Sequence, residues 1–352
     1  MPRMSLAYTI FKDIYQAHSI VINSTLALLL GLILFEMGWL TKSDYQPKGK
    51  HCYVTGGTQG LGKALAESLV RQGAHVTVIA RDVEKGKRVE AELKSIAQPN
   101  QIIQFISADL TDPQSSLDTL NRATERFEGK VPDYIYLCAG FSKPKYMVDS
   151  SMKEFQAGFD GTYWVSAYTA HAAVKLMVTQ RVLGKIVFVS SFLGYTSFAG
   201  YTNYSPGKYA LRGLADALRS EMLLHDIKIH IFMPCGIAGP GYEAENEFKP
   251  AVTLKIEEDD TQISPEQCAA ALETGLRKGY YQITDNIVCD FARLRSNGGV
   301  PTNNFFADCF YLFISSFGLP IWRMTADATV RKGRKAVQED YEARGVYDHS
   351  SK

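Results

Sequence analysis

The stretch Thr55-Gly56-Gly57-Thr58-Gln59-Gly60-Leu61-Gly62 decides which fold this chain adopts. It follows a short apolar run, HCYVT at 51–55, and it precedes a segment with helical spacing at 63–72. Glycines at a strand-to-helix junction let the backbone approach a pyrophosphate closely, and the helix start adds free N–H groups and a positive dipole end. We therefore predict a dinucleotide site at this turn, against the alternative of an ordinary glycine turn.

Apolar runs and helical segments alternate from residue 51 onward. Further strands are expected at 75–80, 102–108, 134–139, 185–190 and 228–233, and further helices at 84–96, 116–127, 155–178 and 204–224. Nearly continuous apolar strands suit a parallel sheet that is covered on both faces. This order of elements predicts an α/β fold with a doubly wound parallel sheet, a Rossmann fold, over residues 49–295.

The composition fits a large folded domain and argues against a polyanion-binding protein. The chain has 352 residues, of which 46% are hydrophobic, and 38 basic residues balance 37 acidic ones to a formal net charge of +1. Such an even balance does not attract polyanions, so we expect no nucleic-acid partner. The six cysteines stand far apart in the sequence, without a CxxC pair. We therefore expect no metal site and a reducing compartment.

An apolar segment near the N-terminus predicts a membrane anchor. Residues 20–40, IVINSTLALLLGLILFEMGWL, have the length of one membrane-spanning helix, with Trp39 and Tyr45 placed for the interface. A signal peptide and a buried helix are the alternatives, although Glu36 and Trp39 occupy the end where a signal peptide carries small residues. More basic residues follow the segment than precede it, which favours a cytoplasmic main body. We assign residues 1–48 to this tail and anchor.

The alternating pattern loosens toward the C-terminus. Residues 242–262 are rich in acidic residues and suggest a loop or lid, and Ser264 before Pro265 indicates a helix start. For a second apolar stretch at 305–322 we expect an in-plane or re-entrant contact with a membrane, and a buried helix and a true span are the alternatives. Residues 296–352 are therefore predicted to be a hydrophobic, membrane-associated extension with a basic tail.

The ends of the second and third strands indicate which dinucleotide binds. Arg81 follows the second strand, so a cation suited to a 2′-phosphate stands where a carboxylate would bond a ribose 2′-hydroxyl. Lys85 is placed to reach the same phosphate. Asp82 leaves an alternative open, because a shift of one residue would make it the ribose acid. We predict NADPH rather than NADH, and we place Asp109, before Leu110 at the end of the third strand, at the adenine edge.

Three polar residues after the fifth strand form a catalytic candidate. Ser191 stands at the carboxyl end of that strand, placed to hydrogen-bond a substrate carbonyl, and Tyr204 and Lys208 follow on a predicted helix. Residues four apart share one helix face, so the ammonium can approach the phenol. A nearby cation lowers the pKa of a phenol and makes proton transfer feasible near neutral pH. The spacing Tyr-x-x-x-Lys by itself often arises by chance. Its occurrence together with Ser191 and the upstream glycine turn is much harder to explain by chance.

These motifs resemble the short-chain dehydrogenase/reductase family. The resemblance rests on TGGTQGLG at 55–62, CAG at 138–140, Ser191, YSPGK at 204–208 and Pro234, and it covers residues 50–240. Within the family, the chain is similar to the 3-ketodihydrosphingosine reductases of the fungal kind. The segments that carry this closer likeness are IARD at 79–82, YSPGKYALRGLADALRSEM at 204–222 and GPGYEAENEFKP at 239–250.

The resemblance implies NADPH-dependent reduction of the C3 ketone of 3-ketodihydrosphingosine, in sphingolipid biosynthesis at the cytosolic face of the endoplasmic reticulum. It implies that Tyr204 donates the proton, Ser191 polarises the carbonyl, and Lys208 lowers the Tyr204 pKa and holds the nicotinamide ribose. It also implies a possible homodimer. The cofactor-binding residues would be Gly56, Thr58, Gln59, Gly60, Gly62, Arg81, Lys85, Asp109, Leu110, Tyr204, Lys208 and, through its backbone, Ile237.

The chain departs from the family pattern at three positions. Cys138 replaces an Asn after the fourth strand, Thr162 stands where many relatives carry an Asn, and Gly239 stands where a Thr often contacts the cofactor. We therefore predict a catalytic triad and not a tetrad. Two other functions remain open: reduction of another lipophilic ketone such as a steroid, a retinoid or a 3-ketoacyl thioester, and a scaffold that binds NADPH without turnover.

Overall fold

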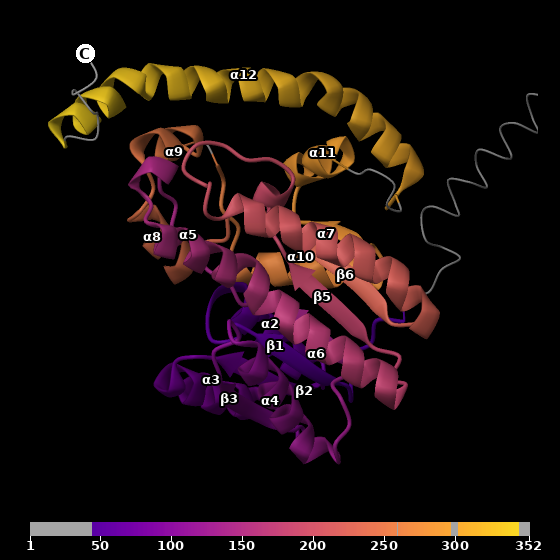
Figure 1. Cartoon of the computed structure of the whole chain (residues 1–352). Coiled ribbons are helices and arrows are strands. Elements are labelled where there is room, and N and C mark those ends of the chain that lie inside the picture. Colours follow the sequence, from indigo (N-terminus) through magenta and orange to yellow (C-terminus); the bar gives the residue numbers. More distant parts are fainter. Residues whose placement is uncertain (1–43, 259, 297–301, 345–352) are drawn as a thin grey trace, which may run out of the picture.

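The computed structural model describes residues 44–258, 260–296 and 302–344 and contains a parallel sheet with helices on both faces (Figure 1). The strand order is β3-β2-β1-β4-β5-β6-β7, and every neighbouring pair is parallel. This arrangement confirms the predicted α/β sheet. The strands are β1 His51–Thr55, β2 His75–Ala80, β3 Ile103–Ser107, β4 Tyr134–Leu137, β5 Lys185–Val189, β6 Lys228–Met233 and β7 Gln282–Thr284.

Two layers of helices bury the two faces of the sheet. Helices α2 (Gly60–Arg71), α3 (Val83–Ile96) and α10 (Pro265–Arg277) cover one face, and α4 (Pro113–Thr124), α6 (Val165–Gln180) and α7 (Ser205–Met222) cover the other. Successive strand residues point to opposite faces. In β1, Cys52 and Val54 therefore join the core under α2, and Tyr53 joins the core under α6.

Local capping explains where several helices begin. The side chain of Asp82 accepts a hydrogen bond from the Lys85 N–H at the start of α3, and Asp112 caps α4 in the same way. Ser264 and Gln267 form a reciprocal capping box at the start of α10, with Pro265 in the first turn. The predicted helix start at Ser264 is thus confirmed.

The segment 242–262, predicted to be a loop or lid, contains two short helical stretches. It contains most of α8 (Pro240–Asn246) and all of α9 (Ala251–Ile256). Val252 and Thr253 of α9 are buried, so tertiary packing stabilises a helix that is too short to form alone. Another difference lies before α6, where α5 (Met152–Phe159) continues through a π-helical turn at Asp160–Trp164.

The predicted membrane span at 20–40 lies outside the described residues. The placement of Tyr45 at a membrane interface is wrong, because this side chain is only 5% exposed and stacks on Tyr134 at 5.5 Å between ring centroids. Its hydroxyl lies 3.1 Å from the Tyr136 hydroxyl and 3.2 Å from a carboxylate oxygen of Glu273. The chain therefore enters the core by residue 45.

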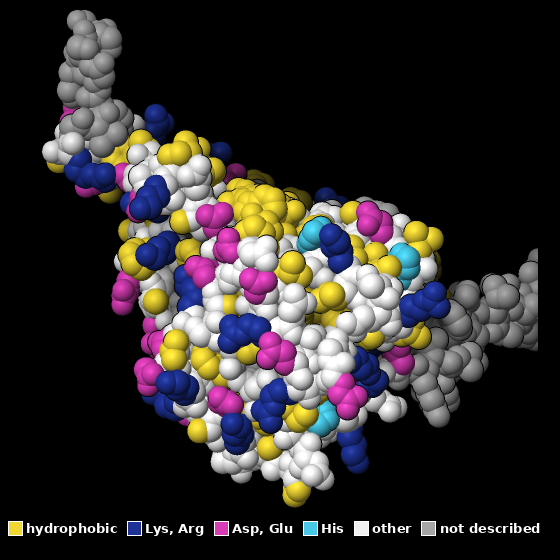
Figure 2. Space-filling model, turned by 60° about the horizontal axis from the view of Figure 1, so that its bottom comes forward, with side chains coloured by type: hydrophobic (Ala, Val, Ile, Leu, Met, Phe, Trp, Pro, Cys, Tyr) yellow, Lys and Arg dark blue, Asp and Glu magenta, His cyan; other side chains and the backbone are white. Residues whose placement is uncertain are grey.

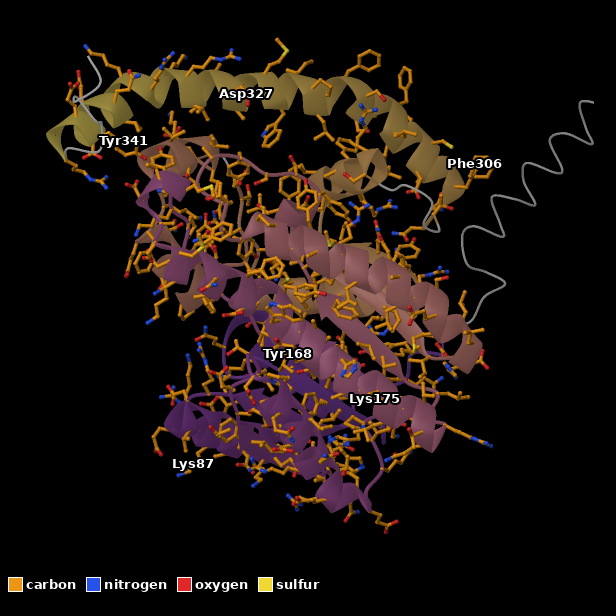
Figure 3. All side chains as sticks on the ribbon, viewed as in Figure 1. Lys87, Tyr168, Lys175, Phe306, Asp327 and Tyr341 are labelled. Atoms are coloured by element: carbon orange, nitrogen blue, oxygen red, sulfur yellow. The ribbon has the colours of Figure 1, made fainter. Side chains whose placement is uncertain are left out.

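One long helix, α12 (Phe305–Ala343), runs across the catalytic body beside α9 and α11 (Ile287–Arg295), with Phe306 and Tyr341 near its two ends (Figures 1 and 3). Its length and composition are sufficient to cross a membrane. One side packs on the body, where Arg293 and Asp308 form a buried ion pair of 2.6 Å. The buried-helix alternative for 305–322 is wrong, because Phe310, Phe313 and Phe317 are each more than 60% exposed.

The surface of the catalytic body carries charges of both signs. Figure 2 shows Lys and Arg side chains interspersed with Asp and Glu on the face that it presents. This mixture agrees with the balanced composition and gives no extended basic surface on that face.

Candidate active site

The glycine turn after β1 has the shape that a dinucleotide requires. Gly56 has φ of +65°, and a Cβ there would lie 2.9 Å from the Ala139 Cα. A Cβ on Gly62 would collide with the Gly56 carbonyl, so both positions exclude any larger residue. Around Gly60 no heavy atom of the described chain lies within 4 Å of such a Cβ. The turn thus presents open backbone at the start of α2, where a pyrophosphate fits.

A single cavity of about 570 Å³ brings the predicted cofactor and catalytic residues together. It extends from the glycine turn past the end of β2 to the end of β5. The predicted residues that line it are Gly56, Thr58, Gln59, Gly60, Gly62, Arg81, Lys85, Asp109, Leu110, Ser191, Tyr204, Lys208 and Ile237. Ligands bind at the carboxyl ends of strands in open parallel sheets, and this cavity lies there.

The end of β2 presents the Arg81 cation to the cavity, and the neighbouring Asp82, which also lines it, caps a helix. The strand ends at Ala80, as predicted, and Asp82 is occupied as the N-cap of α3, with its carboxylate 2.9 Å from the Lys85 N–H. The alternative in which Asp82 is the ribose acid therefore loses support. The ammonium of Lys85 hydrogen-bonds to the Gln59 side-chain oxygen, which links α3 to the glycine turn. Arg81 is exposed and lines the cavity.

Asp109 and Ile237 lie at opposite ends of the predicted cofactor path. Asp109 is exposed; desolvation raises its pKa, but hydrogen bonds from the N–H and hydroxyl of Thr111, with a further contribution from Arg81, give a net lowering. Ile237 pairs in parallel with Ile263, whose backbone bonds to the residues on either side of Ile237. Because backbone groups alternate direction along a strand, the N–H and C=O of Ile237 point away from Ile263.

Ser191, Tyr204 and Lys208 converge at one end of the cavity. Ser191 follows β5 and accepts a hydrogen bond of 3.1 Å from the Leu193 N–H. Tyr204 is the N-cap residue of α7, and its phenol hydrogen-bonds with Ser191. The Lys208 ammonium lies 5.5 Å from the centroid of the Tyr204 ring and donates a 3.1 Å hydrogen bond to the Val189 carbonyl. The predicted shared face of Tyr204 and Lys208 is thus present.

The pKa of the Tyr204 phenol differs from the sequence-based expectation that it is lowered. Burial raises the pKa of Tyr204, the negative charge of Glu245 raises it further, and the hydrogen bond with Ser191 only partly opposes this. Burial also lowers the pKa of Lys208 to about 8. The Tyr204 pKa is therefore raised in the protein alone and not lowered as predicted, because desolvation outweighs any stabilisation of the phenolate by Lys208. The phenol keeps its proton and can act as an acid.

Thr162 takes part in helix geometry and not in the cavity lining. Its side chain is buried, and its hydroxyl donates a 2.7 Å hydrogen bond from the π-helical turn to the Gly158 carbonyl of α5. A Cβ on Gly207 would collide with this hydroxyl, so α7 packs directly against it. The catalytic triad without Thr162 stays a prediction.

The fold also creates groupings that the sequence did not suggest. The side chains of Tyr201, Glu245, Lys249 and Glu257 form a charged group in the cavity wall. The spacing of Glu245 and Lys249, four apart, was the available signal. Cys235 and Cys289, distant in sequence, have their sulfurs 2.8 Å apart and lie near Asp285. That separation is shorter than the roughly 3.8 Å of two thiolates on one tetrahedral zinc, so it does not favour a metal.

Comparison with known proteins identifies the family. The sequence pattern of the family described as short chain dehydrogenase matches residues 50–249. The chain belongs to the short-chain dehydrogenase family. It is therefore an oxidoreductase with the family's parallel sheet, which confirms the predicted family and enzyme class.

Curated relatives narrow the comparison within this short-chain dehydrogenase family. The chain is 62% identical to a 3-ketodihydrosphingosine reductase of Cryptococcus neoformans, over 92% of this chain and 98% of that protein. It is 32% identical to a 3-ketodihydrosphingosine reductase of Aspergillus fumigatus, over 86% of this chain and 92% of that protein. These two relatives share the chain's length and not only its central domain.

Solved structures share the fold at low sequence identity. An alcohol dehydrogenase of Thermococcus sibiricus, complexed with 5-hydroxy-NADP, is 20% identical with a TM-score of 0.57, over 67% of this chain and 96% of that chain. A short-chain dehydrogenase/reductase of Burkholderia phymatum, in complex with NAD, is 18% identical with a TM-score of 0.63, over 72% of this chain and 95% of that chain. At such low sequence identity, the likeness shows a shared fold alone.

Proposed function

We propose that this protein catalyses the NADPH-dependent reduction of 3-ketodihydrosphingosine to dihydrosphingosine. The observation that carries the proposal is the convergence of Ser191, Tyr204 and Lys208 at the end of a dinucleotide cavity. That cavity belongs to a chain 62% identical, over 92% of its length, to a protein named 3-ketodihydrosphingosine reductase. A nicotinamide dinucleotide is the cofactor class that the fold and the glycine turn support.

A bound NADPH supplies two electrons and one hydrogen to the ketone carbon. Tyr204 supplies the remaining proton to the ketone oxygen, and its raised pKa ensures that the phenol carries that proton at neutral pH. Ser191 hydrogen-bonds with the Tyr204 phenol in the protein alone, and the ketone oxygen would take the place of that phenol as acceptor of the Ser191 O–H. Lys208 keeps a positive charge at pH 7 and lies over the ring, where it stabilises the phenolate left after the transfer.

The 2′-phosphate of NADPH is assigned to Arg81 and Lys85. Both side chains line the cavity at the end of β2, and Asp82 is turned toward its own helix. A guanidinium binds phosphate oxygens in a planar, bidentate manner, whereas a carboxylate at this place would repel them. This arrangement favours NADPH over NADH.

Membrane association is part of the proposed function, because the substrate carries a long alkyl chain. The outer side of α12 exposes Phe310, Phe313, Phe317 and Ile321, and no other part of the described chain covers it. Such a face lies readily at the boundary between lipid headgroups and acyl chains. With the apolar segment at 20–40, we infer an enzyme at the endoplasmic reticulum membrane with its catalytic body in the cytosol. A homodimer remains a prediction.

The decisive experiment is NADPH oxidation by the full-length protein in detergent with 3-ketodihydrosphingosine as substrate. We expect turnover with NADPH, slower turnover with NADH, and a loss of roughly 10²- to 10⁴-fold in kcat for Tyr204→Phe, the usual range for a general acid. If the protein instead reduced a steroid, a retinoid or a 3-ketoacyl thioester more efficiently, that compound would take the place of 3-ketodihydrosphingosine as the proposed substrate. Full biological activity of Tyr204→Phe would favour the non-catalytic scaffold.

A further inference from the structure

Four side chains beside the catalytic phenol form a compact charged group, here called the Tyr201 cluster: Tyr201, Glu245, Lys249 and Glu257. The Tyr201 hydroxyl lies 2.8 Å from Glu245 Oε1 and 2.6 Å from Glu257 Oε1. The Lys249 ammonium lies 3.2 Å from Glu245 Oε1 and 2.6 Å from Glu257 Oε2. Helices α8 and α9 and the turn before α7 are thereby joined around one wall of the cavity.

The Tyr201 cluster carries a net negative charge. Two carboxylates face one ammonium, and burial together with both carboxylates raises the pKa of Tyr201, so its phenol stays neutral. The Lys249 side chain is fully buried and the Glu257 side chain is 10% exposed, while Glu245 is 19% exposed. A partly buried negative charge without a full counter-charge is costly, so the site favours a further cation.

The negative charge of the Tyr201 cluster acts on the catalytic phenol of Tyr204. The rings of Tyr201 and Tyr204 are 5.8 Å apart between centroids, and Glu245 raises the pKa of the Tyr204 phenol. During reduction, negative charge develops on the ketone oxygen next to Tyr204, and a fixed carboxylate nearby opposes that change. A cation on the substrate, between the ketone and Glu245, would reverse the effect. Lys208 does not supply this cation, because its ammonium already donates a hydrogen bond to the Val189 carbonyl.

We propose that Glu245 binds the protonated amine of a 2-amino-3-ketone substrate and thereby selects this class over neutral ketones. The inference rests on the proposed function, in which the amine is attached to the carbon next to the ketone. Within the described residues, the contacts of Glu245 with Tyr201 and Lys249 both involve Oε1, which leaves Oε2 to accept from the ammonium. Glu257 also lines the cavity but is more deeply buried, and its two oxygens are occupied by Lys249 and Tyr201.

The test compares two substrates that differ only in the amine. The full-length protein in detergent micelles, saturated with NADPH, is assayed with 3-ketodihydrosphingosine and with the same ketone lacking the 2-amino group. The variants are Glu245→Gln, which removes the charge, Glu245→Asp, which keeps it, and Glu243→Gln as control. Glu243 lies on the same helix, is exposed and does not line the cavity. NADPH binding and Tm of each variant report on folding.

For Glu245→Gln we expect kcat/KM for the amino ketone to fall on the order of ten- to a hundredfold, the usual worth of a hydrogen bond to a charged group. The value for the deaminated ketone should not fall below that of wild type, because the charge removed opposes reduction of a neutral ketone. Glu245→Asp should be intermediate for the amino ketone, and Glu243→Gln should be unchanged. Equal losses for both ketones, or no loss, would overturn the role of Glu245 alone. A wild-type protein that does not reduce the amino ketone would overturn the proposed function and this inference together.

Discussion

Trp322, in the middle of α12, contacts Phe192, the residue that follows Ser191. Their ring centroids are 6.3 Å apart with the ring planes at 83°, and Trp322 meets Phe198 in a similar edge-to-face contact at 6.1 Å. Trp322 also lines the catalytic cavity. The helix with the exposed apolar face therefore forms part of the cavity wall. We propose that this wall gives an alkyl chain an apolar path from the membrane to the active site.

Trp322→Ala should impair use of the lipid substrate without affecting the cofactor. An edge-to-face aromatic contact contributes about 0.5–1.5 kcal/mol beyond burial, so we expect kcat/KM for 3-ketodihydrosphingosine to fall roughly three- to tenfold or more. The KM for NADPH should not change, because the glycine turn lies at the other end of the cavity. Met324→Ala, on the exposed side of the same helix, is the control. A raised KM for NADPH would contradict this explanation.

The exposed face of α12 should contact lipid in the full-length protein. Cys309 is an exposed cysteine of this face, four and eight residues before Phe313 and Phe317. A fluorescent label on Cys309 should be quenched by brominated lipids in vesicles, and the double variant Phe313→Glu/Phe317→Glu should lose that quenching. Leu183→Glu, an equally exposed apolar residue elsewhere, should leave it intact. Unchanged quenching in the double variant would exclude an in-plane contact through these residues.

Lys208 should make stability depend on pH in a defined direction. Its pKa is about 8 in the folded protein and 10.5 ordinarily, so the unfolded chain binds more protons between these values. The free energy of unfolding should therefore rise from pH 8 toward pH 10.5, at up to about 1.4 kcal/mol per pH unit from this group. Urea unfolding without NADPH measures this rise. In Lys208→Met this rise in the free energy of unfolding should vanish. An equal dependence on pH in both proteins would assign the rise to other titrating groups.

Arg81→Ala should weaken NADPH selectively. Loss of a charge-assisted contact to phosphate costs about 1.5–3 kcal/mol, so the KM for NADPH should rise roughly ten- to a hundredfold. The KM for NADH should stay nearly constant, because NADH has no 2′-phosphate. Lys87→Ala serves as the matched control, since Lys87 is exposed on α3 and lies away from the cavity lining (Figure 3). Parallel increases for both cofactors would remove Arg81 from the 2′-phosphate site.

The ion pair of Arg293 with Asp308 should fix α12 to the catalytic body. Arg293 is 2% exposed and also contacts Asp290 at 3.0 Å. Asp308→Ala leaves a buried guanidinium without its main partner and should lower the free energy of unfolding by about 3–5 kcal/mol. Hydrogen exchange should show α12 loosened first. The double variant Arg293→Met/Asp308→Leu should recover most of this stability, and failure to do so would indicate a packing role instead.

The central sheet and the cofactor turn could be predicted because their signals are local. Strand runs such as HCYVT and HVTVIA, and the glycine turn between strand and helix, depend on neighbours in the chain. The short β7 was missed because a strand of Gln282–Thr284 has too few residues for a pattern. The helices α8 and α9 were missed because packing, and not periodicity, stabilises them.

Sequence alone determined the first six strands of the sheet, the order in which they occur along the chain, and the residue types placed at their carboxyl ends. Only the tertiary structure decided that Trp322 of α12 joins the cavity wall, that Glu245 stands near Tyr204, and that burial keeps the Tyr204 phenol protonated. The reason is physical: a pKa and a cavity wall depend on solvent exclusion and on charges brought together from distant segments. Spacing along the chain fixes which side chains share a helix face, but not how far water is excluded from them.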